Sequence, residues 1–245
     1  MISISIISHG QFYLVKNILD DLEAYCKEYI EVILTINIPE ELPKDFSNYH
    51  YPIKLMINPT PKGFGANHNT AFQKASQAYF CVLNPDIRLD KSDKNIFLVL
   101  TEKINKDKNI GVIAPMITDE KNILQDSARK FLNFTELSKR IFCKSTPESN
   151  NNNPDWIAGM FMLFRKEVYT EINGFDESYY LYCEDMDLCA RLREKNYEIY
   201  YDNTVKIIHS AQRQSHKKIG YLIWHIQSLL RYLHRYYSCF KNIRH

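Results

Sequence analysis

The stretch Tyr79-Phe80-Cys81-Val82-Leu83-Asn84-Pro85-Asp86 joins a run of apolar residues to an abrupt stop. Tyr79–Leu83 has the length and composition of a buried strand. Pro85 ends the strand and forces an extended turn, which projects Asp86 beyond its carboxyl end. Ligands bind at that edge of open α/β sheets, and a carboxylate there can hold Mg²⁺ or Mn²⁺ beside phosphate oxygens. Asn-Pro-Asp is also common turn chemistry, so a purely structural turn is the alternative.

Strand and helix patterns alternate on both sides of this segment. We expect further strands over residues 2–8, 31–36, 53–57 and 111–114, and helices over residues 11–29, 65–78 and 93–106. The second half is less regular, with a helix from Glu184, strands near 197–201 and 205–208, and a helical tail from His216. Repeated strand–helix–strand units predict an α/β fold with a mostly parallel central sheet and helices on both faces.

Composition and charge favour a globular protein whose C-terminal tail, residues 216–245, meets an anionic surface. The chain has 245 residues, of which 45% are hydrophobic and 24% charged, and a net charge of +2. All 29 acidic residues precede Asn203, so the end of the chain is basic and the rest acidic. This acidic majority and the absence of a nucleic-acid-binding motif argue against nucleic acid as a partner.

Cysteine usage and hydropathy predict a cytoplasmic protein. The six cysteines form no Cys-x-x-Cys pair and indicate free thiols in a reducing compartment. The opening segment Met1–Ile7 has a strand pattern without the basic residues that begin a signal peptide. No apolar run reaches the roughly 18 residues that span a bilayer. The inner face of the cell membrane is the alternative location, because of the basic tail.

The acidic sequence Glu184-Asp185-Met186-Asp187 is a second candidate for chemistry. It begins a helix, and Asp185 shares the inward face of Leu188 and Leu192. Acidic residues at a helix N-terminus are often only favourable with the helix dipole. An inward carboxylate can also act as a base toward a hydroxyl group. Asp187 and Arg191, four residues apart, are expected to form a structural ion pair.

Two other segments carry polar side chains suited to binding. The loop from Asn58 to Asn69 combines amides with Gly63 and Gly65 before a helix, which suits close approach to a nucleotide. It matches neither the Walker motif nor Gly-x-Gly-x-x-Gly. His209 follows a strand and is expected to be structural or to complete a metal site at the sheet edge.

In their order and spacing these segments resemble glycosyltransferase family 2, particularly its bacterial rhamnosyltransferase-like members. The similarity runs from Ile2 to about Ser215 and includes the opening strand, Gly63-Phe64-Gly65-Ala66-Asn67-His68-Asn69, Asn84-Pro85-Asp86, Trp156-Ile157-Ala158-Gly159-Met160, Gly174-Phe175-Asp176-Glu177 and Tyr182-Cys183-Glu184-Asp185-Met186-Asp187-Leu188. Each piece alone is weak, but their joint order is specific.

The resemblance implies a GT-A fold and an inverting sugar transfer from a nucleotide-diphosphate sugar. It implies that Asp185 is the catalytic base and that Asp86 and His209 contact a divalent cation, Mg²⁺ or Mn²⁺. The nucleotide-sugar-binding residues it implies are Ser8, His9, Asn37, Gly65, Asn67, Asn84 and Asp86. Those implied for the acceptor, a saccharide or a lipid-linked saccharide, are Trp156, Gly159 and Glu184.

Two departures from the family pattern bear on these expectations. Asn84 stands where the metal motif has its first acid, which puts tight metal binding in doubt. Asn37 stands where many relatives have an Asp that holds the base or ribose, which leaves the nucleotide open. We expect L-rhamnose transfer from dTDP-rhamnose in bacterial surface polysaccharide synthesis. The alternatives are a UDP-hexose-dependent transferase and a degenerate nucleotide-sugar-binding protein without catalysis.

The expected organisation is one transferase domain, residues 1–215, followed by the tail. Residues 1–115 are expected to bind the nucleotide sugar, and residues 116–215 the acceptor. The tail sets apolar residues at helical spacing with basic residues around them. It is expected either to dock on the domain or to lie on an anionic membrane, and a docked helix with its basic side toward the bilayer would combine the two.

Overall fold

An eight-stranded sheet with the order β3-β2-β1-β4-β9-β6-β10-β5 forms the centre of the computed structural model, which describes residues 1–89, 95–130, 154–210 and 219–242. Its strands are β1 (Ile2–Ser8), β2 (Ile30–Ile36), β3 (Ile53–Ile57), β4 (Tyr79–Leu83), β5 (Ile87–Leu89), β6 (Ile110–Thr118), β9 (Phe161–Arg165) and β10 (Glu198–His209). All run in one direction except β9 and β5, so the sheet is mostly parallel, as predicted. A small second sheet pairs β7 (Ala128–Arg129) with β8 (Trp156–Ile157).

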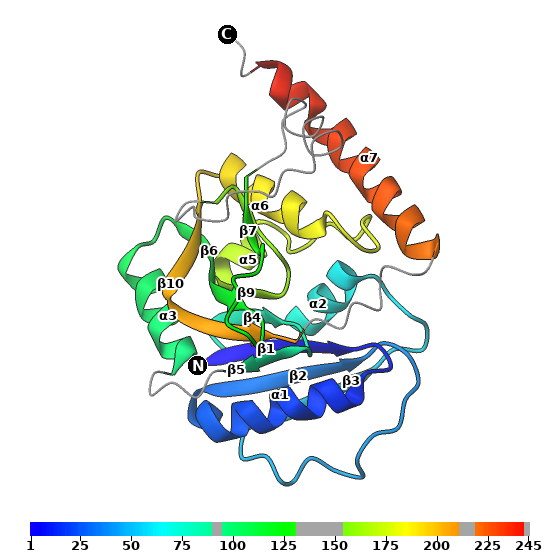
Figure 1. Cartoon of the computed structure of the whole chain (residues 1–245), viewed down its shortest axis with the longest axis vertical. Coiled ribbons are helices and arrows are strands. Elements are labelled where there is room, and N and C mark those ends of the chain that lie inside the picture. Colours follow the sequence, from blue (N-terminus) through cyan, green and yellow to red (C-terminus); the bar gives the residue numbers. More distant parts are fainter. Residues whose placement is uncertain (90–94, 131–153, 211–218, 243–245) are drawn as a thin grey trace.

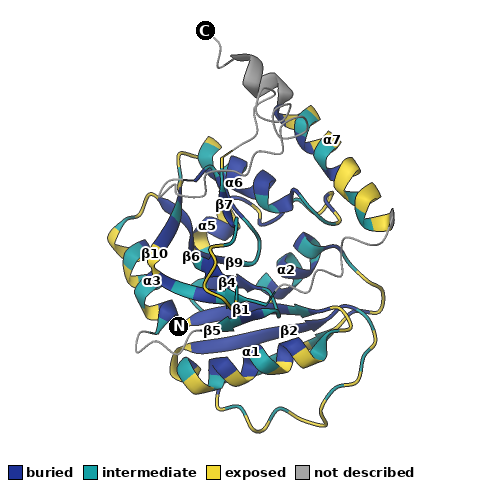
Figure 2. Ribbon diagram, in the orientation of Figure 1, coloured by how far each residue is buried: buried dark blue, intermediate teal, exposed yellow. Residues whose placement is uncertain are grey.

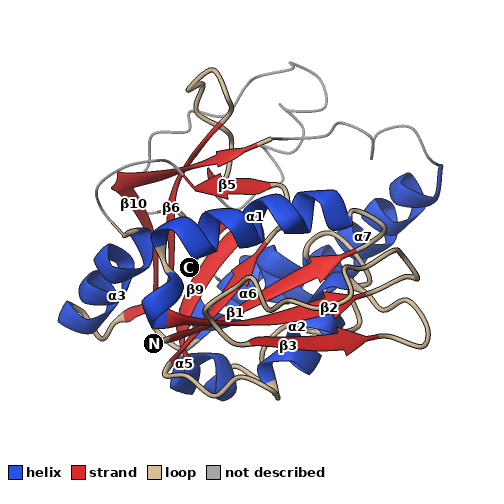
Figure 3. Cartoon of the chain, turned by 90° about the horizontal axis from the view of Figure 1, so that it is seen from below, coloured by secondary structure: helices blue, strands red, loops and turns tan. Residues whose placement is uncertain are grey.

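Helices cover both faces of the sheet, as the alternating pattern predicts (Figures 1 and 3). The helices α1 (Phe12–Tyr25) and α3 (Ile96–Lys106) pack on one face, and α2 (Phe64–Phe72), α5 (Lys166–Glu171) and α6 (Glu184–Glu194) on the other. Successive residues of β4 alternate between the two cores: Cys81 packs with α1 and α3, whereas Phe80 and Val82 pack with α2 and α5. A strand buried on both faces reads as a continuous apolar run, which is why Tyr79–Leu83 is recognisable in the sequence.

Several element boundaries differ from the expected ones, for local reasons. The first helix ends at Tyr25 and is followed by the short 3₁₀ helix η1 (Lys27–Tyr29). The helix expected over 65–78 stops at Phe72, because the Ser76 N–H donates to the carboxylate of Glu31 instead of to a helical carbonyl. The two late strands are one strand, β10, with an irregularity between Asp202 and Lys206 that interrupts its pattern. The strands β5 and β9 were not expected.

The C-terminal helix α7 (Ile219–Asn242) packs on the domain through one side. Tyr232 and Tyr236 are buried in the core that contains α6, and the Ser228 hydroxyl donates to the Leu181 carbonyl at 2.8 Å. Arg231 donates to the Ser178 carbonyl, and Arg235 pairs with Asp176. The arginines therefore point to the domain and not outward.

The outward side of α7 is exposed (Figure 2), and one strip of it is apolar. Four large aliphatic side chains form it, which we call the apolar strip: Leu222, Ile223, Ile226 and Leu230, each 48–62% exposed. Lys217 and Lys218, which contribute to the basic charge of the tail, lie outside the described residues. Among the residues described, no helix combines the length and the hydropathy needed to cross a bilayer.

Candidate active site

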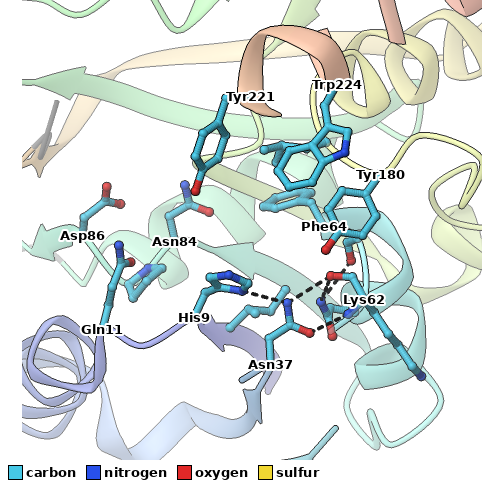
Figure 4. A pocket seen from close by; sticks show the side chains of 15 residues that line it. His9, Gln11, Asn37, Lys62, Phe64, Asn84, Asp86, Tyr180, Tyr221 and Trp224 are labelled. Carbon is cyan, nitrogen blue, oxygen red and sulfur yellow. Dashed lines mark hydrogen bonds between the residues drawn. The ribbon is translucent and has the colours of Figure 1, made fainter. Parts of the chain in front are cut away.

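A pocket of about 260 Å³ opens at the carboxyl ends of β1, β2 and β4. Its walls are formed by Ile7, His9, Gln11, Asn37, Lys62, Gly63, Phe64, Asn67, Asn84, Pro85, Asp86, Tyr180, Leu181, Tyr221 and Trp224 (Figure 4). It brings together five of the residues expected to bind a nucleotide sugar, which are far apart in the sequence. Asp86 and Asn84 lie toward one end of the pocket and Lys62 and Tyr180 toward the other (Figure 4).

A network of three amides, Asn37, Asn58 and Asn67, shapes the floor of the pocket. Asn37 Nδ2 donates to His9 Nδ1 and to the Lys62 carbonyl, and its Oδ1 accepts from Asn58 Nδ2 and the Lys62 N–H, all at 2.8–3.0 Å. Both donors and both acceptor positions of this amide are thus used within the chain. Asn67 Nδ2 is likewise used, by the Lys62 and Gly63 carbonyls. In this arrangement Asn37 and Asn67 hold the 58–63 loop, and His9 presents its ring to the pocket.

Asp86 and His209 meet at the end of the antiparallel pair β5–β10. His209 Nε2 lies 3.0 Å from Asp86 Oδ2, and the Ser210 N–H donates to the Asp86 carbonyl at 3.0 Å. The second carboxylate oxygen of Asp86 is buried and has no hydrogen-bond partner within the described part of the chain. An imidazole nitrogen, a carboxylate and an unpartnered buried oxygen fit a divalent cation.

The described residues contain no cluster of three or more His, Cys, Asp or Glu side chains arranged for a metal. Asp86 and His209 would therefore hold a cation only in company with oxygens from the substrate and water. This is the mode that Mg²⁺ adopts with nucleotide phosphates, where one or two carboxylates suffice. The Asn84 side chain lines the same end of the pocket and offers a neutral amide there.

Asp185 is held by backbone groups in the first turn of α6. Its Oδ2 accepts from the Gly159 N–H at 3.0 Å and its Oδ1 from the Met186 N–H at 2.9 Å. Burial raises the pKa of Asp185 despite these two hydrogen bonds. Glu184 is buried, and one of its oxygens has no partner among the described residues. Its burial, together with the neighbouring Asp185, raises its pKa well above the usual range.

Two consecutive residues before this helix have left-handed backbone conformations. Tyr182 has φ 70° and Cys183 has φ 64°. Non-glycine residues adopt this region only when the surrounding structure imposes it, and such strain gathers at functional sites. The turn fixes the direction in which α6 begins and so places Asp185 beneath Gly159.

Asp185 does not line the pocket directly, because Phe64 and Gly159 lie beside it. A Cβ built on Gly159 would come within 3.1 Å of the Phe64 ring and 3.9 Å of Asp185 Cβ. Trp156, expected on the acceptor side, is buried and packs under the guanidinium of Arg129 at 4.9 Å from its ring centroid. Of the residues expected to bind the acceptor, Gly159 lies beside Phe64 of the pocket wall.

Two residues expected to bind the nucleotide sugar lie outside the pocket wall. Ser8 is fully buried, and its backbone carbonyl accepts from the Asn37 N–H at 2.8 Å. A Cβ on Gly65 would clash with Phe175 at 2.6 Å, so this glycine permits helix packing and not ligand approach. Gly63 takes the pocket position instead, and a Cβ there would meet the Tyr180 carbonyl at 2.6 Å.

Several pocket residues escaped the sequence reasoning: Gln11, Lys62, Phe64, Tyr180, Tyr221 and Trp224. Phe64 lies in the glycine-containing loop from Asn58 to Asn69, so the sequence of that loop could have identified it as a pocket residue. Tyr221 and Trp224 belong to α7, and their rings form a group with Tyr180, 4.7 Å from Trp224. No sequence periodicity indicates that this helix closes the pocket.

The pair of Asp187 and Arg191 is structural, as expected. The two side chains meet at 2.7 Å, and Asp187 is fully buried. Tyr236 also donates to Asp187 at 3.0 Å, and Arg235 lies 3.1 Å from it. Asp187 therefore connects α7 to α6 and has a structural role.

Sequence comparisons show which known proteins this chain is similar to. Rhamnosyltransferase WbbL of Escherichia coli is 30% identical over 96% of this chain and 93% of its own length. An N-acetylglucosaminyl-diphospho-decaprenol L-rhamnosyltransferase of Mycobacterium tuberculosis is 22% identical over 62% of this chain and 53% of its own. Residues 139–217 match the family model described as the N-terminal domain of galactosyltransferase.

A solved structure shows the same fold. The structure of GalNAc-T7 with UDP, GalNAc and Mn²⁺ superposes with a TM-score of 0.69, covering 87% of this chain and 44% of that one at 13% identity. The α/β fold expected from the sequence is therefore confirmed as GT-A. From the extended similarity to rhamnosyltransferase WbbL and from this fold, the chain belongs to glycosyltransferase family 2, among its rhamnosyltransferase-like members.

Proposed function

We propose that this glycosyltransferase moves L-rhamnose, with inversion, from dTDP-L-rhamnose to a lipid-linked saccharide during bacterial surface polysaccharide synthesis. The observation that supports this proposal is that Asp185 lies next to Gly159 and Phe64 at a pocket whose far end is lined by Asp86, which His209 contacts. The rhamnose assignment draws on the 30% identity to the Escherichia coli rhamnosyltransferase. The lipid-linked acceptor draws on the name of the mycobacterial relative.

In the proposed reaction Asp185 accepts the proton of an acceptor hydroxyl as its oxygen attacks the anomeric carbon. The new carbon–oxygen bond forms while the bond from that carbon to the diphosphate oxygen breaks, and dTDP leaves with the bonding electron pair. A raised pKa suits this role, because a stronger base takes the proton more readily. A divalent cation held by Asp86 and His209 would offset the negative charge on the departing diphosphate.

Donor choice would depend on side chains with open hydrogen-bonding capacity. The Asn37 amide is fully used within the chain, so we assign the base and ribose contacts to His9, Gln11 and the Lys62 region. A UDP-hexose donor is the alternative within the same class. The division into a donor part, residues 1–115, and an acceptor part, residues 116–215, remains our prediction.

We also propose that α7 brings the enzyme to the anionic inner face of the cell membrane. The apolar strip faces outward, no acidic residue follows Asn203, and the inner side of the same helix lines the pocket through Tyr221 and Trp224. A helix with an exposed aliphatic side inserts shallowly among lipid headgroups, and net basic charge in the same segment favours anionic ones. This places the pocket beside the surface that would hold a lipid-linked acceptor.

A donor panel tests the transferase proposal. Purified protein with Mn²⁺ or Mg²⁺ is incubated with dTDP-L-rhamnose, UDP-glucose, UDP-GlcNAc and UDP-galactose, and released nucleotide diphosphate is measured. We expect turnover with dTDP-L-rhamnose above all others. Turnover of a UDP-hexose instead would replace the donor, and binding of a donor without turnover in the presence of acceptor would leave only a nucleotide-sugar-binding protein.

A further inference from the structure

Gln125 makes two contacts with His209. It lies in a segment for which the sequence patterns predict no function. Its Oε1 lies 2.6 Å from His209 Nδ1, and its Nε2 donates to the backbone carbonyl of the same residue at 3.0 Å. The Gln125 side chain therefore contacts both the ring and the backbone carbonyl of His209. Two contacts to one residue fix the orientation of the ring as well as the position of the amide.

The hydrogen-bond pattern determines which ring nitrogen of His209 carries the proton. The backbone carbonyl of His209 accepts only, so the Gln125 nitrogen must face it and the Gln125 oxygen must face the ring. A flipped amide would set two acceptor oxygens 3.0 Å apart. Since Oε1 accepts as well, Nδ1 must donate its N–H, so in the neutral imidazole the lone pair is on Nε2.

Nε2 in turn faces the Asp86 carboxylate at 3.0 Å. At this distance the two atoms share either a proton, with His209 as the imidazolium donating Nε2–H to Asp86, or a divalent cation that lies against both. With the unpartnered oxygen of Asp86, the two side chains place an imidazole nitrogen and carboxylate oxygens next to each other, as ligands of a divalent cation would be. Histidines that bind metals commonly donate their other N–H to such a partner, which orients the ring.

The segment that carries Gln125 is itself firmly held. The Gln125 N–H donates to the Ile117 carbonyl at 2.8 Å, and the Ser127 N–H donates to the Gln125 carbonyl at 2.9 Å. The preceding turn is closed by Asp119, whose carboxylate accepts from the N–H groups of Lys121 and Ile123, both at 2.8 Å. A side chain on a fixed backbone is able to impose geometry on its neighbour.

We propose that Gln125 is a positioning residue that holds His209 as the Nδ1–H tautomer, so that His209 Nε2 and the Asp86 carboxylate face one divalent cation together. This rests on the proposed function for the role of the cation. The tautomer itself follows from the contacts of Gln125 alone, so the two statements are separable by experiment.

The test compares the wild-type protein with Gln125→Met, Gln125→Glu and Glu120→Gln. Methionine has nearly the length of glutamine without its hydrogen bonds, whereas glutamate keeps an acceptor for Nδ1–H. Glu120 belongs to the same turn but accepts from Ser210, not from His209, and serves as the matched control. Binding of Mn²⁺ in the presence of dTDP is measured by calorimetry, and the His209 tautomer by ¹⁵N NMR of the ring.

We expect Gln125→Met to weaken Mn²⁺ binding about 10–100-fold and to give a mixture of ring tautomers. Gln125→Glu keeps the acceptor for Nδ1–H but sets an oxygen against the His209 carbonyl, so its affinity should fall between those of Gln125→Met and the wild type. Glu120→Gln should bind as the wild type does. Unchanged Mn²⁺ affinity in a folded Gln125→Met protein would overturn the proposal. An Nε2–H tautomer in the wild type would overturn it even if that variant fails to fold.

The same data separate this inference from the proposed function. A wild-type protein that binds no Mn²⁺ with dTDP but holds His209 as the Nδ1–H tautomer would refute the cation and leave the orienting role of Gln125 intact. Mn²⁺ binding that is equal in all four proteins would support the cation and refute Gln125.

Discussion

The side chains of Asp86 and His209 lie 3.0 Å apart although 123 positions separate them in the chain. The antiparallel pairing of β5 with β10 brings them together, since Ile87 and His209 are register partners. We predict that His209→Ala weakens Mn²⁺ binding in the presence of dTDP by at least about tenfold, because one of two protein donors is lost. Calorimetry measures this, with His50→Ala, an exposed histidine paired with Glu23, as control. Equal affinity in both variants would remove His209 from the site.

Replacement of Asp185 by Asn should reduce kcat by about 10²–10⁴-fold, because the amide cannot accept the hydroxyl proton. The affinity for dTDP should change little, since Asp185 is not part of the pocket wall. Turnover and dTDP binding are measured on the same preparation, with Asp20→Asn as a surface control. Retention of turnover would exclude Asp185 as the base.

The pH dependence of turnover should report the same carboxylate. Burial raises the pKa of Asp185, so the active, deprotonated form is lost at a higher pH than for an ordinary aspartate. The acid limb of kcat/KM should therefore lie above the usual range of Asp. A limb at the usual value in the wild type would show that Asp185 is solvated in the working enzyme.

Because of Glu184, the free energy of unfolding should decrease as the pH rises. Its folded pKa is raised, so the folded protein keeps a proton that the unfolded chain releases once the pH exceeds the usual Glu range. The unfolded state then binds fewer protons, and the free energy of unfolding falls with increasing pH up to the raised pKa. Glu184→Gln should raise Tm at neutral pH by about 2–4 °C for each kcal/mol recovered, with little change at pH 4. Equal Tm differences at both pH values would contradict this.

Asp187 should be more important for stability than for chemistry. Its buried carboxylate accepts from Arg191 and Tyr236 and lies beside Arg235, so Asp187→Ala leaves buried groups unpaired and should cost about 3–5 kcal/mol. Tyr236→Phe removes only one hydrogen bond and should cost about 1 kcal/mol. Denaturant unfolding measures both. Similar losses in the two variants would mean that the ion pair with Arg191 contributes little.

The apolar strip should govern binding to vesicles. Leu222→Ser, Ile226→Ser and Leu230→Ser combined should abolish co-sedimentation with vesicles that contain phosphatidylglycerol, and leave turnover of a water-soluble acceptor unchanged. Exposed aliphatic residues elsewhere, changed together as Ile57→Ser and Leu98→Ser, serve as the control. Vesicle binding by the triple variant would refute the strip as the contact surface.

The fold followed from local patterns where burial is continuous along the chain. The run before Asn84 and the stop at Pro85 identify a central strand and the sheet edge at which Asp86 lies. The pairing of Asp187 with Arg191 was also predictable, because helix geometry alone brings residues four apart together.

The rest of the site depends on contacts between distant segments. Gly65 has the sequence context of a ligand-binding glycine, but its neighbour in space is Phe175, which only the packed fold reveals. Asn37 follows β2 as expected, yet its hydrogen bonds go to Asn58 and Lys62. The contribution of Gln125 has no local signature, since it arises from the turn after β6 meeting the end of β10.

The two sides of α7 have a practical consequence for shortened forms of the protein. A chain ended at residue 215 retains every predicted catalytic and metal-binding side chain, yet it lacks Tyr221 and Trp224, which wall the pocket. The truncated protein is expected to bind the donor more weakly and also to lose its attachment to lipid. Deletion of the helix therefore cannot separate targeting from catalysis, whereas point changes on its outer side can.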